Sequence, residues 1–494
     1  MEHRKTKILH VDGDNFFVAC EVARFPHLKG KPVIVGEERG IASAMSYEAK
    51  KLGIHRGMPV FEIREKFPQV TILPAHFELY EQYAQNLYQV LCKYSDTVER
   101  YSIDECFALL NEEDILKYEH KKTSPTITDT QKDSNKTLLQ TIKEDAEECL
   151  GITLSFGLAC TKTLAKIGSK FNKPSGCVTI SESDRETFLK NTDIGKVWGI
   201  GRAISASLTS YNIKTAYDFI KLDSSFIKKH YGEGTLDTWY ELKGEKRLEL
   251  NTESRVPKSL QSTRSFGKSF NIFKNTTSDV ANNTAPLDFQ APRERSFFLS
   301  ELSNHAESLC ARLRSHGLST NRVSFFLKKN TLTNRYISRE LELGFYTNNA
   351  SDLCKAIFKE CENIFSEIDS GLFERNNQSS QTNNKQFGWP TYNQPSYSTP
   401  QNFGFKIKAT GISVYQLKPL EAVQDDLFAI QSTRDSRSQY NEVIDSLKSR
   451  LGDDSVYLCS SLESKKRRDQ IFNQRNLKNK FIYGLPLPYM GEVS

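Results

Sequence analysis

The order of strand and helix signals over residues 8–158 constrains the fold more than any other feature of this sequence. Apolar spacing indicates, in order, a strand ending at Asp12, a helix at 80–94, two strands meeting near residue 104, a helix at 138–149 and a strand at 154–158. The last strand alternates apolar and polar residues, which is typical of a half-buried strand. This order predicts an α+β fold with a split β-α-β sheet and helices on one face.

The rest of the 494 residues exceed what one core can hold, so further domains are expected. Residues 182–250 have helical spacing, and a short polar stretch at 251–259 has the composition of a linker. Strand and helix signals return over 260–420, interrupted at 376–402 by a low-complexity run rich in Asn, Gln, Ser and Pro. Residues 421–494 are charged and mostly poor in periodicity, which predicts a mobile tail with some local order.

Bulk composition restricts the class of protein without deciding its function. The formal net charge of +6 permits a polyanionic partner but equally fits an enzyme with a slightly basic surface. The ten cysteines include no C-x-x-C pair, so we expect reduced thiols and no structural zinc. The sequence has no signal peptide and no apolar run near the roughly 18 residues of a membrane span. We therefore expect a soluble protein of the cytoplasm.

Three carboxylates carry the chemistry that the sequence suggests. Asp12 ends the first strand, and Asp104-Glu105 lies where two other strands meet. If the first and middle strands are neighbours, these acids meet at one edge of the sheet. Hard cations such as Mg²⁺ take carboxylate and phosphate oxygens, and two such ions can serve phosphoryl transfer. Gly13 could add its backbone carbonyl. The alternative is that each acid is an ordinary turn or capping residue.

Two segments closely resemble the signature motifs of Y-family translesion DNA polymerases. They are Asp12-Gly13-Asp14-Asn15-Phe16-Phe17-Val18-Ala19-Cys20-Glu21 and Tyr101-Ser102-Ile103-Asp104-Glu105-Cys106-Phe107. Shorter matches follow in family order at 31–35, 46–50, 165–167 and 172–176. The resemblance covers about residues 5–420 and implies a right-hand-like polymerase. Its parts would be a palm at 1–15 and 79–181, small fingers at 16–78, a helical thumb at 182–250 and a small α/β little finger at 260–420.

The resemblance assigns expected roles to residues of both motifs. Asp12, Asp104 and Glu105 correspond to the catalytic acids, which with Gly13 would hold two Mg²⁺ ions. Phe17 corresponds to the steric gate, an aromatic ring that excludes a ribonucleotide 2′-hydroxyl; its plain alternative is a core aromatic. The other expected nucleotide-binding residues are Phe16, Tyr47, Lys50 and Lys173. The sequence departs from many relatives at Ala44, where they carry a hydroxyl residue, and at Lys50, where they carry the bidentate Arg.

DNA binding is expected in two places. Gly199-Ile200-Gly201 resembles a helix-hairpin-helix turn, whose backbone N–H groups bind phosphates, although a G-x-G turn is also a common plain helix junction. Basic residues of the second sheet resemble the DNA-facing side of the little finger, although a solvated basic face has the same composition. They are Arg264, Lys268, Arg322, Lys328, Lys329 and Arg335.

The expected partners are primer-template DNA, dNTP and a bacterial-type sliding clamp. Gln424, Leu427 and Phe428 belong to a pentapeptide that resembles the bacterial clamp-binding motif. The tail after residue 429 leans toward the UmuC type, which would add a UmuD-type accessory subunit and a recombinase filament. Phe17 and Ser46-Tyr47-Glu48 lean toward the DinB type. We slightly favour UmuC.

The expected function is low-fidelity, template-directed translesion synthesis in the DNA-damage response. One alternative is a non-catalytic scaffold that recruits other polymerases, which should have lost the three acids. Another is a nucleotidyl cyclase on the same split sheet, which leaves the clamp-like motif unexplained. An NTPase is disfavoured because Gly267-Lys268-Ser269 follows Ser262, where a P-loop has glycine.

Overall fold

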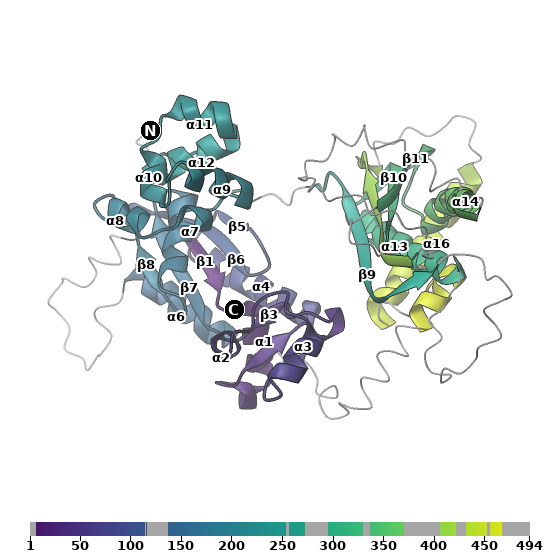
Figure 1. The fold of residues 1–494 in the computed structure, drawn as a ribbon, viewed down its shortest axis with the longest axis horizontal. Coiled ribbons are helices and arrows are strands. Elements are labelled where there is room, and N and C mark those ends of the chain that lie inside the picture. The colour runs from purple at the N-terminus through teal and green to yellow at the C-terminus, as the bar shows by residue number, and fades with distance from the viewer. Residues whose placement is uncertain are drawn as a thin grey trace, which may run out of the picture. The chain divides into compact units, whose positions relative to one another are not determined.

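The chain forms two compact units that divide between residues 254 and 255 (Figure 1). The computed structural model describes residues 6–113, 115, 137–252, 256–271, 295–329, 336–369, 406–420, 431–451 and 455–466. The low-complexity run at 376–402 and the clamp-like pentapeptide at 424–428 lie outside these residues. Among the described residues, no helix is both long enough and apolar enough to cross a membrane.

A five-stranded sheet is the centre of the first unit. Its strand order is β5 (Val98–Arg100), β6 (Glu105–Asn111), β1 (Thr6–Gly13), β7 (Leu154–Ala159) and β8 (Cys177–Thr179). Strand β1 is antiparallel to both neighbours, β6 and β7, whereas β7 and β8 are parallel. The prediction that the first and middle strands lie side by side is confirmed.

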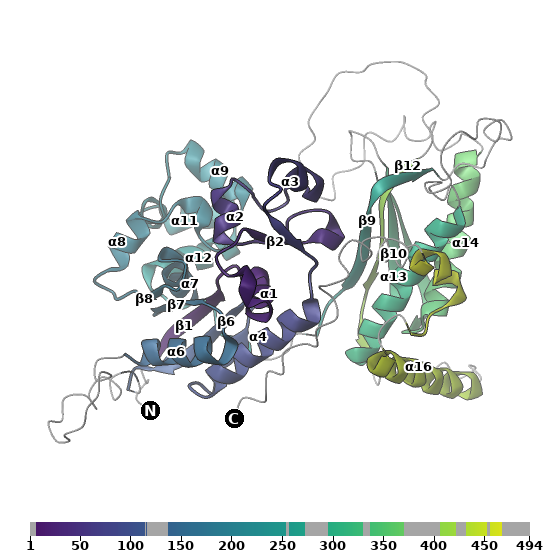
Figure 2. The ribbon, with the colours of Figure 1, turned by 90° about the horizontal axis from the view of Figure 1, so that it is seen from below.

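Helices cover both faces of this sheet, which corrects the expectation of helices on one face. Helices α4 (Phe77–Cys92) and α6 (Leu138–Leu150) pack on one side, and α7 (Lys162–Phe171) packs on the other (Figure 2). A side chain at Gly157 of β7 would place its Cβ only 2.0 Å from the Ala165 carbonyl oxygen, so α7 can approach backbone to backbone. Strand β7 is therefore buried along its whole length, and the half-buried prediction is wrong.

Local signals explain where these helices begin and end. Thr137 and Gln140 form a capping box at the start of α6, and Gly151 ends it in the left-handed conformation. The apolar stripe of α4 is buried, from Leu79 to Leu91. Both helices were expected from the apolar spacing, because it repeats over several turns.

The segment between β1 and α4 forms a small lobe of its own. It contains α1 (Phe16–Arg24), η1 (Pro26–Leu28), β2 (Val33–Val35), η2 (Glu37–Arg39), β3 (Ala44–Met45), α2 (Tyr47–Lys51), α3 (Val60–Lys66) and β4 (Thr71–Leu73). The strands form a sheet in the order β3-β2-β4 over a separate apolar core. Ser46 caps α2 and also accepts a hydrogen bond from the Val33 N–H, which ties the helix to this sheet.

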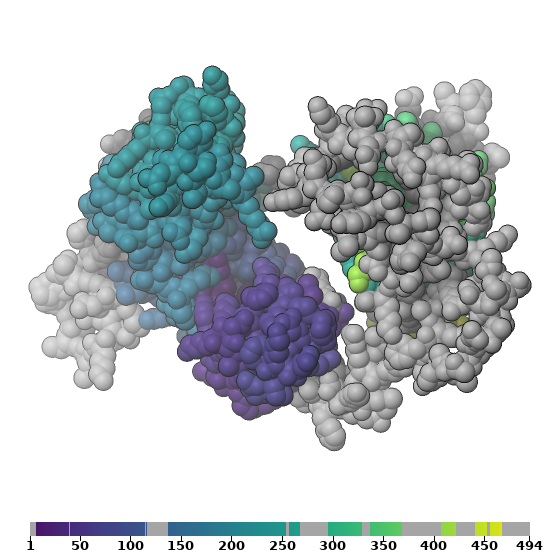
Figure 3. All heavy atoms as spheres, viewed as in Figure 1, coloured from purple at the N-terminus to yellow at the C-terminus, as the bar shows by residue number. Residues whose placement is uncertain are grey.

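Residues 182–250 are helical, as the sequence predicts. The elements are α8 (Arg185–Lys190), η3 (Ile194–Lys196), α9 (Arg202–Ser210), α10 (Ala216–Ile220), α11 (Ser224–Tyr231) and α12 (Glu233–Lys243). Their apolar residues share one core with α7. Figure 3 shows these helices in teal and the small lobe in purple, with a hollow between them above the central sheet.

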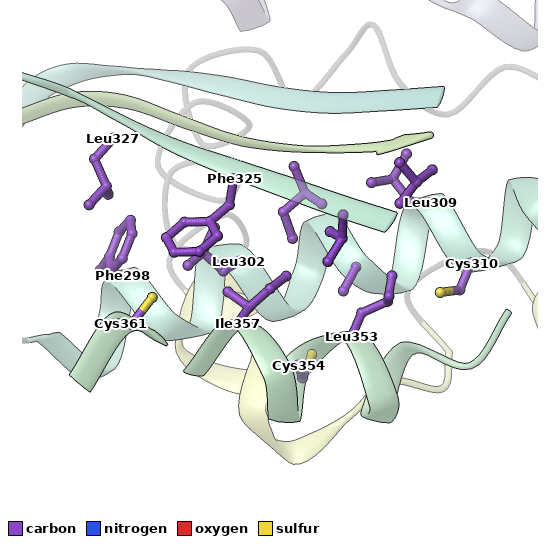
Figure 4. Packing of buried hydrophobic residues seen from close by; sticks show 14 of the residues in the cluster. Phe298, Leu302, Leu309, Cys310, Phe325, Leu327, Leu353, Cys354, Ile357 and Cys361 are labelled. Carbon is purple, nitrogen blue, oxygen red and sulfur yellow. The ribbon is translucent and has the colours of Figure 1, made fainter. Parts of the chain in front are cut away.

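The second unit is an antiparallel sheet with helices on one face. The strand order is β11 (Tyr336–Thr347), β10 (Leu318–Lys329), β12 (Lys406–Tyr415) and β9 (Leu260–Asn271), and β13 (Lys418–Pro419) pairs with the start of β10. Helices α13 (Arg295–Ser315) and α14 (Ala350–Asp369) cover the sheet. Figure 4 shows Phe325 and Leu327 of the sheet meeting Phe298, Leu302 and Ile357 of the helices, and all five are buried.

The end of the chain is more ordered than the sequence suggests. Helix α16 (Gln431–Leu451) and η7 (Cys459–Ser461) belong to the second unit and pack near α13. Arg314 of α13 binds Asp445 of α16 through two N–O contacts of 2.6 and 2.7 Å. Buried Glu307 accepts hydrogen bonds from the Leu458 N–H, the Lys448 ammonium and the Ser461 hydroxyl. The described part of this segment therefore has the local order that was expected, and in addition it packs on α13 through specific polar contacts.

Candidate active site

The expected acids lie together at one edge of the central sheet. Asp12 of β1 stands opposite Glu105 of β6 in the antiparallel register. The backbone N–H of Gly13 donates to the Asp104 carbonyl at 2.9 Å, which places the main chain of Asp104 next to this pair. The Asp104 carboxylate accepts a hydrogen bond from the Ser102 hydroxyl at 2.6 Å. Asp12 and Glu105 are far apart in the sequence, and the pairing of β1 with β6 brings them together.

The surroundings shift the pKa values of the two paired carboxyls, Asp12 and Glu105, in opposite directions. Burial raises the pKa of Asp12 to about 6, and the charge of Lys173 opposes this rise while that of Glu105 adds to it. Burial also acts to raise the pKa of Glu105, but the Lys166 ammonium at 2.8 Å, a hydrogen bond with Asp12 and the charge of Lys170 together hold that pKa below its usual value. The edge therefore concentrates negative charge that nearby cations stabilise.

A lysine and a further aspartate complete this edge. The Lys173 ammonium binds the Asp12 carboxylate and lies 3.5 Å from Asp14. Asp14 is buried and accepts hydrogen bonds from the Ser155 hydroxyl at 2.8 Å and the Ser175 N–H at 2.6 Å. Asp14 thus fastens the segment that carries Lys173 to the end of β1. Sequence reasoning gave no role to Asp14, although it stands in the first motif.

The acids suit a hard divalent cation in their chemistry. Among the residues that the structure describes, no three His, Cys, Asp or Glu side chains form a ready metal cage. The donors are carboxylate oxygens, however, and a magnesium site completed by substrate phosphates needs only one or two carboxylates from the protein. The ammonium groups of Lys166 and Lys173 already contact these oxygens, so cations are stabilised there. The residues therefore fit the expected metal.

Tyr47 and Lys50 lie beside the same edge. The Lys50 ammonium is 2.5 Å from the Asn15 amide oxygen and 4.6 Å from the centroid of the Tyr47 ring. Burial, followed by the charge of nearby Lys173, lowers the pKa of Lys50. Burial, followed by the charges of Asp14 and Asp12, raises the pKa of Tyr47 to about 12. The structure thus brings together three of the expected nucleotide-binding residues, Tyr47, Lys50 and Lys173.

Phe17 is held in a small group of aromatic rings. Its ring stacks on Tyr80 with centroids 4.4 Å apart and planes 11° from parallel, and Phe77 meets it edge-on at 5.7 Å. The Tyr80 hydroxyl donates to buried Glu21 at 2.6 Å, which fixes the ring beneath Phe17. Phe16, by contrast, is fully buried and packs under Gly13, where an added Cβ would lie 2.6 Å from its ring.

The glycine turn precedes a helix, as expected. Gly199 has a φ of 90°, and a Cβ there would lie 2.4 Å from the Thr238 hydroxyl of α12. Gly201 is the N-cap of α9 and has open space around it. The N–H groups at the start of α9 are therefore accessible to an anion.

The basic residues of the second sheet do not share one face. Arg322 lies on the face away from the helices, 3.4 Å from Glu340 and 3.7 Å from Glu342. Lys328 lies on the same face of β10, because it is six residues further along the strand. Arg264 instead points toward α13 and binds buried Glu301 at 2.7 Å. The interpretation of Arg264 as part of one DNA-facing side is therefore corrected.

The other predicted side chains of this surface and of the clamp motif are not described by the structure. They are Lys268, Lys329, Arg335, Gln424, Leu427 and Phe428.

Comparisons with known proteins agree with these observations. The profile of the impB/mucB/samB family matches residues 11–170, that of the IMS family HHH motif matches 182–213, and that of the impB/mucB/samB family C-terminal domain matches 291–382. The chain is 31% identical over 257 residues to DNA polymerase IV of Citrobacter koseri, covering 51% of this chain and 69% of that protein. It is also 31% identical over 265 residues to DNA polymerase IV of Neisseria meningitidis serogroup B, covering 51% and 79% of the two chains.

A solved structure has the same fold. A Y-family DNA polymerase chimera of Dbh and Dpo4 superimposes with a TM-score of 0.57, covering 83% of this chain and 98% of the chimera at 19% identity.

Proposed function

Because this chain belongs to the impB/mucB/samB family of Y-family DNA polymerases, we propose that Asp12, Asp104 and Glu105 are its catalytic acids. The protein is a template-directed DNA polymerase that performs translesion synthesis, and it is metal-dependent like its family. The observation that carries the assignment is the direct pairing of Asp12 with Glu105, with Asp104 held beside them by the Gly13 hydrogen bond. The slight preference for the UmuC type stays a prediction.

Two Mg²⁺ ions are the metals that this edge would hold. Asp12, Asp104, Glu105 and the Gly13 carbonyl would be their protein ligands, with substrate phosphates completing each site. Such ions activate the primer 3′-hydroxyl and stabilise the negative charge of the transferred phosphoryl group. The acids would orient the cations, and the burial of Asp12 at the sheet edge would strengthen its attraction for them.

The lysines beside the acids would bind the incoming triphosphate. Lys173 is held by Asp14 and Asp12, and Lys50 is held by Asn15. Each places an ammonium point charge where the phosphates would approach, and Tyr47 adds a hydroxyl that can donate. A protein without the Arg fork at position 50 depends more on Lys173 for this grip.

Phe17 would be the steric gate. Its ring is half-buried and supported from below by Tyr80, so it cannot withdraw easily from a substituent at the sugar. A deoxyribose has no 2′-hydroxyl to meet the ring, whereas a ribose does. Rigid support of the ring favours strong discrimination.

DNA would be bound by the turn before α9 and by the open face of the second sheet. The start of α9 offers N–H groups to a phosphate, and Arg322 and Lys328 offer positive charge on one sheet face. These contacts carry no sequence information, which suits an enzyme that must accept any template.

The finer partners are proposed from the sequence. The pentapeptide with Gln424, Leu427 and Phe428 would bind a bacterial-type sliding clamp, and the enzyme would work in the cytoplasm at the nucleoid. A UmuD-type subunit and a recombinase filament are further proposed partners of a UmuC-type protein.

Primer extension on undamaged and abasic templates with Mg²⁺ tests the active site. The wild type should extend the primer, and Asp104→Ala with Glu105→Ala should abolish extension while binding of primer-template DNA persists. Extension by the double variant at the wild-type rate would remove the catalytic assignment. A wild type that stays inactive with a clamp and accessory subunit supplied would favour the scaffold alternative.

A further inference from the structure

Three aromatic rings pack beside the catalytic edge. Trp198, Tyr101 and Phe107 form this aromatic cluster: the Trp198 ring centroid is 5.3 Å from that of Tyr101 and 5.9 Å from that of Phe107. The Trp198 indole N–H donates to the Tyr101 hydroxyl at 3.0 Å. Tyr101 and Phe107 flank the acids in the sequence, whereas Trp198 comes from the segment just before α9. The aromatic cluster therefore joins the helical region to the strand that carries Glu105.

Two lysines of α7, one turn apart, enter this cluster. The Lys162 ammonium lies 4.6 Å from the Phe107 ring centroid and binds buried Glu99 at 2.6 Å. The Lys166 ammonium lies 4.4 Å from the Tyr101 centroid and 5.2 Å from the Trp198 centroid. Lys166 is buried as well. Lys162 is thus paired with a buried acid outside the catalytic set, whereas Lys166 points toward the active site.

The Lys166 ammonium lies 2.8 Å from the Glu105 carboxylate, so this side chain joins the aromatic cluster to the charged group of a catalytic acid. A lysine stem is flexible, and its ammonium is a point charge without a preferred direction of its own. Two ring faces and one carboxylate together restrict where the Lys166 ammonium can lie. Without the ring of Trp198, Lys166 would gain other rotamers, and Glu105 would lose a fixed partner.

We propose that Trp198 is a positioning residue for nucleotide addition, which acts by holding the Lys166 ammonium against Glu105. This inference rests on the proposed catalytic role of Glu105. Trp198 also directly precedes the Gly199-Ile200-Gly201 turn, so the segment offered to DNA phosphates and the catalytic carboxylate share one neighbour. Trp198 thereby links the segment proposed to bind DNA phosphates to the position of the Glu105 carboxylate.

Single-turnover incorporation of one dNTP with Mg²⁺ tests the inference. For Trp198→Leu, we expect the maximal rate to fall about tenfold, because a desolvated cation–π contact is lost. The affinities for dNTP and for primer-template DNA should stay within about twofold of the wild type, since the proposed role of Trp198 is exerted through Lys166 and Glu105. Trp198→Phe keeps a ring near Lys166 and should recover most of the rate.

A double variant separates positioning from a general structural effect. In a Lys166→Met background, Trp198→Leu should cause little further loss of rate, because the group that it positions is gone. Tyr217→Leu is the matched control: it removes a ring that lies 4.8 Å from Lys190 and 4.0 Å from Lys221, far from any catalytic acid in sequence. This control should leave the rate unchanged.

Several results would overturn the inference. One is an equal loss of rate from Trp198→Leu in the wild-type and Lys166→Met backgrounds. The others are that Trp198→Leu lowers only the affinity for DNA, or that it leaves the rate unchanged while the wild type is active. If the wild type fails to extend any primer, the proposed function fails first and this inference with it. If Trp198→Leu does not fold, Trp198→Phe takes its place: its small loss of rate should vanish in the Lys166→Met background, and persistence there would contradict the proposed action through Lys166.

Discussion

The Lys173 ammonium contacts both Asp12 and Asp14, whereas the Lys50 ammonium contacts an amide oxygen. Lys173 is therefore held by charge on both sides, and Lys50 is held only by a neutral partner. We expect Lys173→Ala to raise the KM for dNTP about tenfold or more, and Lys50→Ala to raise it less, because ion pairs with two carboxylates fix an ammonium more firmly than a contact with a neutral amide oxygen.

Steady-state incorporation kinetics on an undamaged template check this order. Lys50→Arg is an informative companion variant, because the bidentate fork should lower the KM. A larger effect of Lys50→Ala than of Lys173→Ala would contradict the assigned division of labour.

Phe17→Ala should admit ribonucleotides. The Phe17 ring is supported by Tyr80 and cannot be replaced by a neighbour, so its removal should open space for a 2′-hydroxyl. We expect the preference for dNTP over NTP to fall by about a hundredfold, the order of a steric exclusion of a few kcal/mol. Phe61→Ala, which removes an exposed ring of the same lobe, should leave the preference unchanged. Unchanged sugar discrimination in Phe17→Ala would remove the gate assignment.

Arg322 and Arg264 should behave differently although both are basic residues of one sheet. Arg322 and Lys328 lie on the open face, so alanine at either should reduce the slope of log affinity against log salt by about one. Arg264→Ala should leave that slope unchanged and instead reduce the free energy of unfolding by about 3 kcal/mol, because it leaves buried Glu301 unpaired.

Salt titrations of primer-template binding and denaturant unfolding of the same variants check both parts. A changed salt slope in Arg264→Ala with normal stability would show that the sheet binds DNA from its helical side.

The pentapeptide after the second sheet predicts a tether to the clamp. Leu427→Ala with Phe428→Ala should abolish clamp-stimulated synthesis, because these two side chains would fill an apolar pocket on the clamp. Basal extension without the clamp should persist, since neither residue belongs to the catalytic edge. Primer extension with and without a bacterial sliding clamp is the measurement, and equal stimulation of variant and wild type would rule out the tether.

The central sheet and its acids could be predicted because they depend on signals that repeat. Apolar spacing defines the strand before Asp12 and the helices around it, and the split sheet then pairs β1 with β6. The position of α7 on the second face could not be read this way. The position of α7 depends on the close contact of Gly157 with the backbone of α7. Such a contact leaves no repeating pattern of apolar residues in the sequence. The role of Lys166 was missed for the same reason, since it follows from where α7 packs.

Two features of the second unit could not be predicted from apolar spacing: the face on which each strand residue lies, and the packing of helix α16 through polar contacts. Arg264 and Arg322 are both on strands, but only the pairing of Arg264 with Thr410 and of Arg322 with Tyr415 reveals their opposite faces. Helix α16 docks through Asp445 on Arg314, and buried Glu307 receives three polar groups from the same region. Such contacts produce no apolar stripe, so the segment has the composition of a tail.

Gly199→Ala should destabilise the helical region more than an equally strained glycine elsewhere. Gly199 has a φ of 90°, where any Cβ is unfavourable, and its Cβ would also lie 2.4 Å from the Thr238 hydroxyl. Gly232 has a similar φ of 82° but nothing within 4 Å of the added Cβ. We therefore expect Gly232→Ala to cost about 1–2 kcal/mol of unfolding free energy and Gly199→Ala clearly more.

Thermal unfolding of both variants measures the difference, and Gly199→Ala with Thr238→Ala isolates its cause. Removal of the Thr238 hydroxyl should recover the part of the loss that is due to the close contact, leaving the backbone strain common to both glycines. Binding of primer-template DNA should follow the same order, because the turn must keep its shape to present the N–H groups that precede α9. Equal losses at the two glycines, with no recovery from Thr238→Ala, would mean that the packing of this turn on α12 does not determine its shape.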